Sequence, residues 1–261
     1  MPELPDVEGF RRVLADHAQG RPIERVKVRD AGVVRGTTPR RLDRAVRGRR
    51  FRRPRRHGKW LIAPTDGGPT VLLHFGMTGS LSWHGGDEPE HRHDRVVFEL
   101  GGGGELRYRD MRKLQGVRLA GDAAEVDRAL GRLGPDALEV SRRELAELLA
   151  ARRGRLKSVL TDQTVIAGLG NLLADELCWQ AGVDPARAAG DLDGDECGRL
   201  HRAMRRVLRE SIKEGRVPPR GSWLTGVRDD KEATCPRCGV RLARRRLAGR
   251  STVWCPRCQP G

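Results

Sequence analysis

The residues with the clearest chemical potential stand at the start of the chain, in the sequence MPELPDVE. An initiator Met before a small residue is normally removed, which would leave Pro2 with a free secondary amine. Such an amine can attack a carbon atom and form an iminium ion, as a Lys does in a Schiff base. Glu3 could protonate a leaving group, and Asp6 could steady the local charge. A disordered leader could have the same composition, so the rest of the chain must decide.

Two C-x2-C pairs near the other end of the chain have the spacing of metal ligands: Cys235 with Cys238, and Cys255 with Cys258. Each pair can supply two thiolates from one tight turn, and two such turns complete a tetrahedral zinc site. The alternative is two disulfides or redox pairs, which a reducing compartment and the twin spacing disfavour. Four protein ligands leave no open coordination position, so we expect one structural zinc ion.

The charge of the chain predicts a polyanionic partner. Its 261 residues include 51 Lys and Arg against 35 Asp and Glu, and the net charge is +16. We favour nucleic acid over an anionic membrane, because no apolar stretch is long enough to span a bilayer. The start of the chain also lacks the pattern of a signal peptide, so we expect a cytoplasmic protein that associates with the nucleoid when on DNA. A ribosome-like or merely soluble basic protein is the alternative.

A basic stretch and a glycine motif are candidate phosphate contacts. Between the Cys pairs, the sequence RRRLAGR supplies four arginines, which could contact phosphate or form a solvated face: Arg244, Arg245, Arg246 and Arg250. In GLGN, two glycines precede Asn171 where a helix begins, so backbone and side-chain N–H groups could approach a phosphate. An ordinary turn between helices often needs the same residues. Helices on both sides favour a helix-turn-helix variant on a nucleic-acid backbone.

We assign no chemical role to three other His residues and two other Cys residues. His91 and His93 lie near His84, and a second metal site is conceivable. A solvated loop is the better interpretation, because no carboxylate or Cys spacing completes a ligand set. Cys178 and Cys197 lie on predicted helices, and we interpret them as small buried apolar residues.

The elements that must position these residues fall into an α+β order. A helix is predicted after Asp6, which could cap it, because four apolar residues recur at helical spacing before Gly20: Val7, Phe10, Val13 and Leu14. Residues 23–121 then alternate like strands, including a hairpin across the four glycines 101–104. We expect residues 1–121 to form a sheet domain.

From residue 122 the apolar period becomes helical, with five predicted helices separated by polar or Gly-containing breaks. We expect a linker over 122–134, a helical domain over 135–230 and a zinc finger over 231–261. The segment GRVPPRGSWLTGVRDD before the finger is predicted to be a loop, because Pro and Gly interrupt it.

Five motifs together resemble the formamidopyrimidine-DNA glycosylase and endonuclease VIII family of base-excision repair enzymes: PELPDVE, GKWL, HFGMTGSL, GLGN and GRSTVWCPRCQ. The resemblance covers essentially the whole chain in the family's motif order. It implies a β-sandwich with a leading helix, then a helix-two-turn-helix domain with a zinc-ribbon hairpin. It also implies damaged double-stranded DNA as the partner, and we expect the protein to act as a monomer.

The resemblance implies a role for each matched residue. Pro2 resembles the nucleophile that attacks C1′ of a damaged nucleotide, Glu3 the acid and base, and Lys59 a cation on the adjacent phosphate. Elimination of both sugar-phosphate bonds would follow. Three residues resemble phosphate clamps: His74, Asn171 and Arg250. Two more resemble residues that enter an opened duplex. Met77 resembles the residue that fills the hole left by the flipped base, and Arg112 resembles the residue that faces the orphaned partner base.

Three departures from the family pattern leave lesion choice open. Asp6 stands where the formamidopyrimidine branch usually has Glu, Leu114 stands where it usually has Phe, and the loop before the finger looks shorter than that branch's lid. A catalytically silent DNA-binding homologue and an RNA-binding zinc ribbon are the alternatives. An RNA-binding zinc ribbon would explain the charge but would not explain the PELPDVE and HFGMTG motifs.

Overall fold

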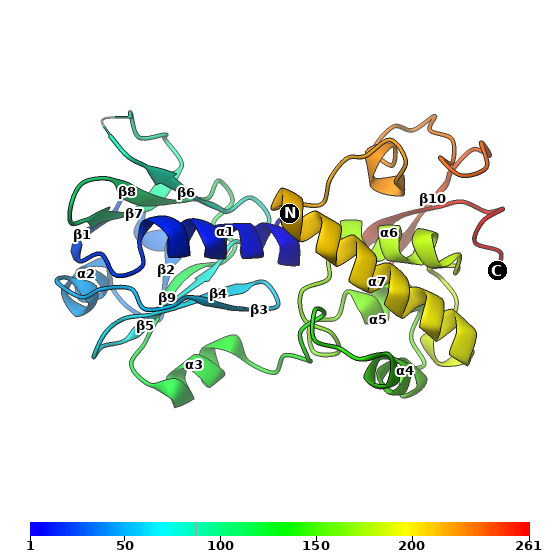
Figure 1. The fold of residues 1–261 in the computed structure, drawn as a ribbon, viewed down its shortest axis with the longest axis horizontal. Helices are drawn as coiled ribbons and strands as arrows, with labels where there is room; N and C mark the ends of the chain where they lie inside the picture. The colour runs from blue at the N-terminus through cyan, green and yellow to red at the C-terminus, as the bar shows by residue number, and fades with distance from the viewer. Residues whose placement is uncertain (87) are drawn as a thin grey trace. The chain divides into compact units, whose positions relative to one another are not determined.

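The chain divides into two compact units in a computed structural model that describes residues 1–86 and 88–261. The first unit contains residues 1–2 and 6–132, and the second contains residues 3–5 and 133–261. The leading helix, α1 (Leu4–His17), therefore begins in the second unit and continues in the first (Figure 1). We expected it to start after Asp6, but Asp6 lies in its first turn. Pro5 is tolerated there because the first N–H groups of a helix have no partner within it.

The first unit is built on two sheets (Figure 1). One has the order β1-β7-β8-β6 and is antiparallel throughout: Ile23–Val28, Asp94–Leu100, Glu105–Arg109 and Ser80–His84. The other has the order β2-β9-β5-β4-β3: Val34–Arg35, Gly116–Ala120, Thr70–His74, Trp60–Pro64 and Arg55–His57. Strands β7 and β8 pair across the four glycines, which confirms the predicted hairpin.

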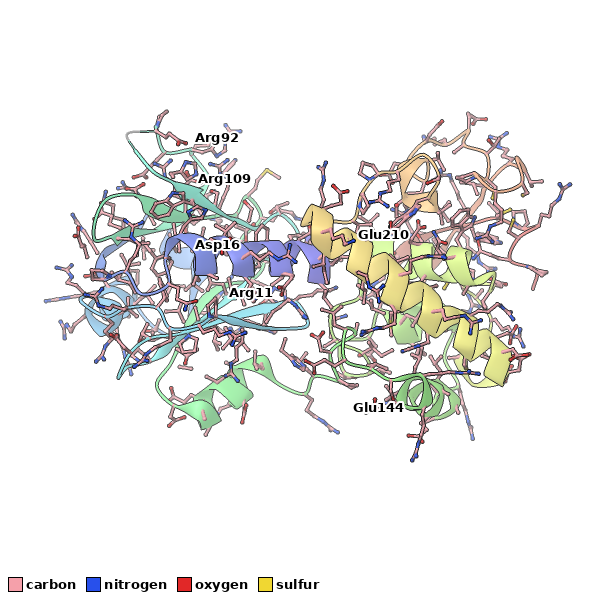
Figure 2. All side chains as sticks on the ribbon, viewed as in Figure 1. Arg11, Asp16, Arg92, Arg109, Glu144 and Glu210 are labelled. Carbon is pink, nitrogen blue, oxygen red and sulfur yellow. The ribbon has the colours of Figure 1, made fainter. Side chains whose placement is uncertain are left out.

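Alternation along the strands places one apolar face of each sheet in a shared core. Val96, Phe98 and Leu100 of β7 are all buried, as are Val71 and Leu73 of β5. Helix α1 covers this core with two further residues of the same cluster, Val7 and Leu14. Some charged side chains, including Arg11, Arg92 and Arg109, project from the ribbon in Figure 2, whereas Asp94 and Arg107 are buried. These features confirm a β-sandwich with a leading helix.

A helix also forms where only strands were expected. Helix α2 (Pro39–Val46) begins after Thr38, whose hydroxyl accepts a hydrogen bond from the N–H of Arg41 at 3.2 Å. Its Leu42 and Val46 side chains are fully buried, so packing offsets the Arg-rich remainder. A Thr N-cap followed by Pro is a recognisable helix start. Our prediction of strands throughout 23–121 was wrong at this point.

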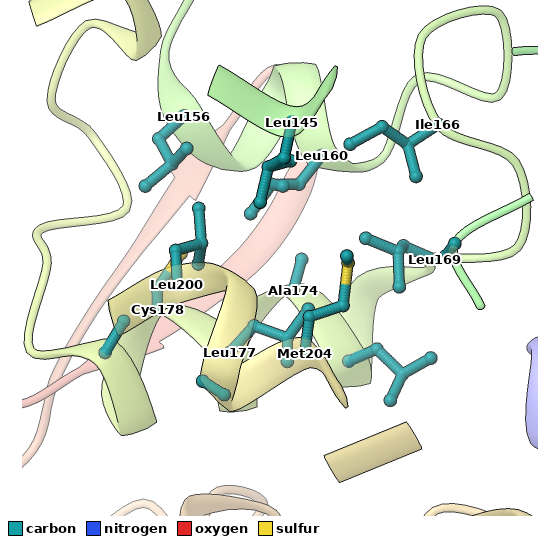
Figure 3. Packing of buried hydrophobic residues seen from close by; sticks show 14 of the residues in the cluster. Leu145, Leu156, Leu160, Ile166, Leu169, Ala174, Leu177, Cys178, Leu200 and Met204 are labelled. Atoms are coloured by element: carbon teal, nitrogen blue, oxygen red, sulfur yellow. The ribbon is translucent and has the colours of Figure 1, made fainter. Parts of the chain in front are cut away.

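The five predicted helical segments all form helices. They are α3 (Ala123–Leu130), α4 (Arg142–Ala150), α5 (Leu156–Leu160), α6 (Asn171–Ala181) and α7 (Gly194–Glu214). Helix α3 belongs to the first unit, and the others belong to the second. Side chains from α4 to α7 interdigitate in one apolar cluster, including Leu145, Leu160, Leu177 and Met204 (Figure 3). Cys178 and Cys197 are buried, as predicted.

The second unit ends in a two-stranded hairpin, formed by β10 (Ala243–Leu247) and β11 (Arg250–Trp254). Its two turn residues, Ala248 and Gly249, both have positive φ, at 45° and 77°. Such a turn matches the right-handed twist of the strands. Within the described residues, none of the helices is both long and apolar enough to cross a bilayer.

Candidate active site and nucleic-acid interface

Glu3 is held on the N-terminus of α6, within the second unit. Its side chain is only 1 % exposed, and its carboxylate accepts N–H hydrogen bonds from Gly170 at 2.7 Å, Leu172 at 2.8 Å and Leu173 at 3.2 Å. These groups are among the N–H donors that a helix cannot satisfy internally, and they carry the positive end of its dipole. The carboxylate is therefore fixed in position before any substrate arrives.

This contact explains the glycines of GLGN. A Cβ atom at Gly170 would lie 2.4 Å from the Glu3 carboxyl carbon, and one at Gly168 would lie 2.6 Å from Leu4. Gly168 also has a φ of 112°, which side chains rarely adopt. We expected these glycines to admit a phosphate to the helix N-terminus. The structure instead places the Glu3 carboxylate on those N–H groups.

Pro2 directly precedes this fixed carboxylate in the chain. Its side chain is half-buried, and it lies just before α1. Because the Leu4 N–H donates to the Gly168 carbonyl at 3.0 Å, the backbone next to Glu3 is anchored as well. An amine at Pro2 would be one peptide unit away from an immobilised proton acceptor, which is the pairing that an activated nucleophile needs.

In the first unit, Lys59 and His74 occupy the ends of neighbouring strands. Lys59 lies in the turn between β3 and β4, and His74 is the last residue of β5. Burial, together with the positive charges of Lys59 and Arg118, lowers the pKa of His74 to about 4. Its Nδ1 accepts the N–H of Gly76 at 3.1 Å, so the neutral ring carries its proton on Nε2. His74 is therefore a neutral N–H donor near the positive charges of Lys59 and Arg118.

Two loops of the same unit bring Met77 and Arg112 together. An Arg112 guanidinium nitrogen lies 3.0 Å from the Met77 sulfur. Thr78 joins the loops, since its hydroxyl donates to Asp110 at 2.6 Å and accepts the Arg112 N–H at 3.0 Å. Leu114 lies on the second loop and is 49 % exposed, against 41 % for Met77. The hydrogen bonds of Thr78 thus hold together the two loops that carry the apolar side chains of Met77 and Leu114 and the guanidinium of Arg112.

The four predicted zinc ligands come together in the second unit. The sulfur atoms of Cys235, Cys238, Cys255 and Cys258 all lie within 4.8 Å of one another. The nearer pairs are 3.5 and 3.9 Å apart. A tetrahedral ion with Zn–S bonds of about 2.3 Å needs sulfur atoms about 3.8 Å apart, so the cluster fits zinc.

The helical part of the second unit supports this cluster. The Trp179 indole N–H donates to the Cys235 sulfur at 3.3 Å. Although burial acts to raise it, hydrogen bonds from Trp179 and from the backbone of Arg237 and Cys238 lower the pKa of Cys235 to about 6. The thiolate form that zinc requires is therefore favoured at Cys235, whereas burial raises the pKa of Cys255 and Cys258.

Arg250 and Asn171 are the remaining predicted contacts, and both lie in the second unit. Arg250 is exposed at the first position of β11, directly after the hairpin turn. Asn171 is the first residue of α6, and its side-chain oxygen has no hydrogen-bond partner among the described residues. The other arginines of the hairpin contact protein groups: Arg244 contacts the Asp230 carbonyl, Arg245 contacts Asp184 at 3.3 Å and Arg246 contacts the Gly249 carbonyl at 3.0 Å.

A buried charge cluster beneath the hairpin was not predicted. Asp175 of α6 is 0 % exposed and pairs with Lys157 and Arg228, each at 2.6 Å. The Lys157 amine also donates to the Ser251 carbonyl at 2.6 Å and the Thr252 hydroxyl at 3.0 Å, both on β11. Burial lowers the pKa of Lys157, whereas the opposite charge of Asp175 acts against that shift. An acid within the apolar pattern of NLLADELCW was the available signal.

Family comparisons agree along the whole chain. The model described as Formamidopyrimidine-DNA glycosylase N-terminal domain matches residues 1–117, and its H2TH domain counterpart matches 133–218. The model described as Zinc finger found in FPG and IleRS matches 234–261. A formamidopyrimidine-DNA glycosylase from Desulfitobacterium hafniense is 38 % identical over 273 aligned residues, covering 99 % of this chain and 100 % of the relative. One from Moorella thermoacetica is 39 % identical, with 99 % and 92 % covered.

Solved structures with DNA have the same fold. Lactococcus lactis Fpg in complex with DNA containing an abasic site is 27 % identical, with a TM-score of 0.88 over 99 % of this chain and 100 % of that one. The same enzyme with DNA containing an oxidised pyrimidine is 28 % identical, with a TM-score of 0.89 over 100 % of both chains. With the three matched domains and the cysteine cluster, these findings show that the chain belongs to the formamidopyrimidine-DNA glycosylase family of base-excision repair enzymes.

Proposed function

We propose that this protein is a bifunctional DNA glycosylase and abasic-site lyase that excises oxidised or ring-opened bases from duplex DNA. The observation that carries the proposal is the Glu3 carboxylate, held by three N–H groups one residue after Pro2. Membership in the family supports it, as do the Fpg relatives solved with abasic and Fapy-dG DNA. The proposed partner is damaged double-stranded DNA, and we propose that a monomer binds it.

In the glycosylase half-reaction, the lone pair of the Pro2 nitrogen attacks C1′ of the damaged nucleotide. The C1′–N bond breaks, and the base leaves with that electron pair and takes a proton from solvent. Glu3 accepts the proton lost by the Pro2 amine and returns it to O4′ when the sugar ring opens. The product is an iminium ion that joins C1′ to Pro2.

In the lyase half-reaction, the iminium ion acts as an electron sink for the two eliminations. Loss of a C2′ proton breaks the C3′–O bond, and a later loss of a C4′ proton breaks the C5′–O bond. The three N–H groups leave lone pairs on the Glu3 carboxylate, so it can accept the first of these protons. We therefore propose β,δ-elimination.

The proposed DNA contacts divide by chemistry. Lys59 would meet the phosphate next to the lesion, and three residues would bind other phosphates: His74, Asn171 and Arg250. The neutral Nε2–H of His74 suits a phosphate oxygen, because it donates without requiring a buried positive charge. Met77 would fill the space left by the flipped base, and Arg112 would donate to the orphaned base.

Borohydride trapping tests the proposed nucleophile. The processed protein should become covalently joined to abasic DNA, because borohydride reduces an iminium ion to a stable amine. Pro2→Gly should trap weakly or not at all. The proposal is wrong if a version that retains Met1 traps as well as the processed protein. A catalytically silent DNA-binding homologue, the alternative, would bind abasic DNA without any trapping or strand cleavage.

We further propose a preference for abasic sites and for oxidised or ring-saturated pyrimidines over 8-oxoguanine paired with cytosine. Helix α7 ends at Glu214, and Trp223 and Leu224 are already buried, so residues 215–222 are what remains for a lid. This segment is held at its far end by the Thr225 N–H, which donates to Glu176 at 2.9 Å. A short lid satisfies few of the polar groups of a flipped purine, and leaving them unpaired is costly.

Single-turnover excision rates on duplexes that differ only in the lesion test this preference. We expect 5-hydroxycytosine and dihydrothymine to be removed faster than 8-oxoguanine opposite cytosine. The opposite order would mean that other groups cover the purine. Lys157 could not be one of them without leaving its buried ion pair with Asp175.

A further inference from the structure

Three large apolar side chains on two loops of the first unit are exposed to solvent. Among the described residues, Met77, Met111 and Leu114 are 41 %, 54 % and 49 % exposed, which is unusual for such large apolar groups here. Two of them lie on residues 110–115, which we call the insertion loop. Since its apolar side chains contribute little burial, the conformation of this loop must be fixed by other contacts.

The backbone of the insertion loop is strained at one position. Lys113 has a φ of 54°, and it is one of two residues other than Gly with positive φ in the described chain. A left-handed conformation costs an L-residue about 1 kcal/mol, and Lys has no side-chain group that offsets this locally. Without restraint, the loop would therefore relax toward ordinary backbone conformations.

Arginines from one strand of each sheet restrain the loop through its carbonyl groups. Arg35 of β2 donates to the Lys113 carbonyl at 2.8 Å and to the Gln115 carbonyl at 3.4 Å. Arg95 of β7 donates to the Asp110 carbonyl at 2.9 Å. Hydrogen bonds from a charged donor are stronger than neutral ones, and these are anchored on strands.

Asp30 completes the restraint through the Lys113 side chain. Its carboxylate accepts a hydrogen bond from the Lys113 amine at 2.9 Å and lies 3.6 Å from Arg95. It also accepts the N–H of Gly32 at 2.9 Å, which fixes its own orientation. The strained residue is thus held on both sides, at its carbonyl by Arg35 and at its side chain by Asp30.

We propose that Asp30, Arg35 and Lys113 are positioning residues that keep the insertion loop in its strained conformation before DNA arrives. The loop can then place Arg112 and Leu114 in the duplex without first becoming ordered. The entropic cost of ordering the loop is therefore not added to the free-energy cost of flipping the base. This inference rests on the proposed function, because it assumes that the loop enters an opened duplex.

The experiment compares Asp30→Asn with a matched control, Glu90→Gln. Glu90 belongs to another exposed ion pair of the first unit, with Arg29 at 2.7 Å, and its substitution makes the same change of charge. The first measurement is hydrogen exchange of amides 111–116 in the free protein. We expect exchange about 2- to 5-fold faster in Asp30→Asn, as for loss of a surface ion pair, and unchanged in Glu90→Gln. Arg35→Met should give a larger increase, about 10-fold.

The second measurement is the rate at which 2-aminopurine beside the lesion becomes unstacked, followed by stopped-flow fluorescence. Asp30→Asn should slow unstacking by a similar factor on a fully paired duplex, and less than about 2-fold where a mismatch has already opened the site. Faster exchange with unchanged unstacking would overturn the inference, as would unchanged exchange. Failure of the unsubstituted protein to unstack or cleave any lesion would instead contradict the proposed function.

Discussion

The insertion loop of the first unit and the β10–β11 hairpin of the second are anchored in opposite ways. Lys113 and Asp30, which hold the loop, are 41 % and 23 % exposed, whereas Lys157 and Asp175 beneath the hairpin are 1 % and 0 % exposed. Water weakens the first pair and cannot reach the second, so the same charges differ several-fold in interaction energy. The comparison indicates that the anchoring of the loop depends on a partly exposed ion pair, whereas a fully buried ion pair supports the hairpin.

Loss of the zinc ion should disrupt the β10–β11 hairpin, and we expect this effect to be the largest. We expect one zinc ion per chain by native mass spectrometry and none in Cys255→Ser, with loss of at least about 100-fold in DNA affinity. The binding energy of a structural zinc is also folding energy, so the hairpin would lose its fixed form. Cys197→Ala, at a buried position outside the cluster, is the control and should retain zinc. A metal-free protein that folds and cleaves abasic DNA would contradict the structural role.

Asp175→Asn should have the next largest effect. It leaves Lys157 buried without a counter-charge and Arg228 with only the exposed Asp229 at 3.4 Å, which typically costs about 3–5 kcal/mol of unfolding free energy. Urea denaturation measures this cost. Glu147→Gln is the matched control, because Glu147 pairs with Arg143 at 2.8 Å on the surface, and its loss should cost less than about 0.5 kcal/mol. Equal effects of the two substitutions would remove the distinction between buried and exposed anchoring.

Arg250→Ala and Lys59→Ala should weaken DNA binding moderately and by similar factors on damaged and undamaged duplexes. Phosphate contacts carry affinity without sequence information, so each loss should also reduce the salt slope by about 1. Arg246→Ala is the control on the same hairpin, since its guanidinium contacts the Gly249 carbonyl. Titrations at several salt concentrations measure these slopes. If affinity is lost for one lesion alone, the substituted residue belongs to the base pocket.

The smallest expected effect concerns the pH response of the first unit. The pKa of His74 is about 4 in the folded chain and near 6.5 when unfolded, so the unfolded chain binds a proton first as the pH falls. The stability that neutral His74 contributes is complete above pH 6.5 and declines from there toward pH 4. His74→Gln should reduce the slope of the unfolding free energy against pH between about pH 4 and pH 6.5. An unchanged slope would mean that His74 does not titrate in this way.

Much of the architecture followed from local patterns. The twin C-x2-C turns, the four-glycine hairpin and the five helices after residue 122 depend on neighbouring residues in the sequence, and all of them form. The local signal for α2 was also present, in Thr38 followed by Pro39, but the surrounding strand patterns obscured it. Spacing thus predicted which elements exist more reliably than where they begin, as the start of α1 at Leu4 illustrates.

Only the tertiary structure decided which groups the charged and polar side chains contact. By itself, the sequence determined that Glu3, Asp175 and Lys113 are present, and which of them resembles a family residue. It did not determine that Glu3 would bind N–H groups 167 to 170 positions away, or that Asp30 would meet Lys113 at a separation of 83. Helical and strand periods report which face of an element is buried, whereas a hydrogen bond between distant residues depends on how the elements pack. For that reason the cysteine cluster could be predicted from spacing, but the hydrogen bonds of Glu3 and the anchors of the insertion loop and of the β10–β11 hairpin could not.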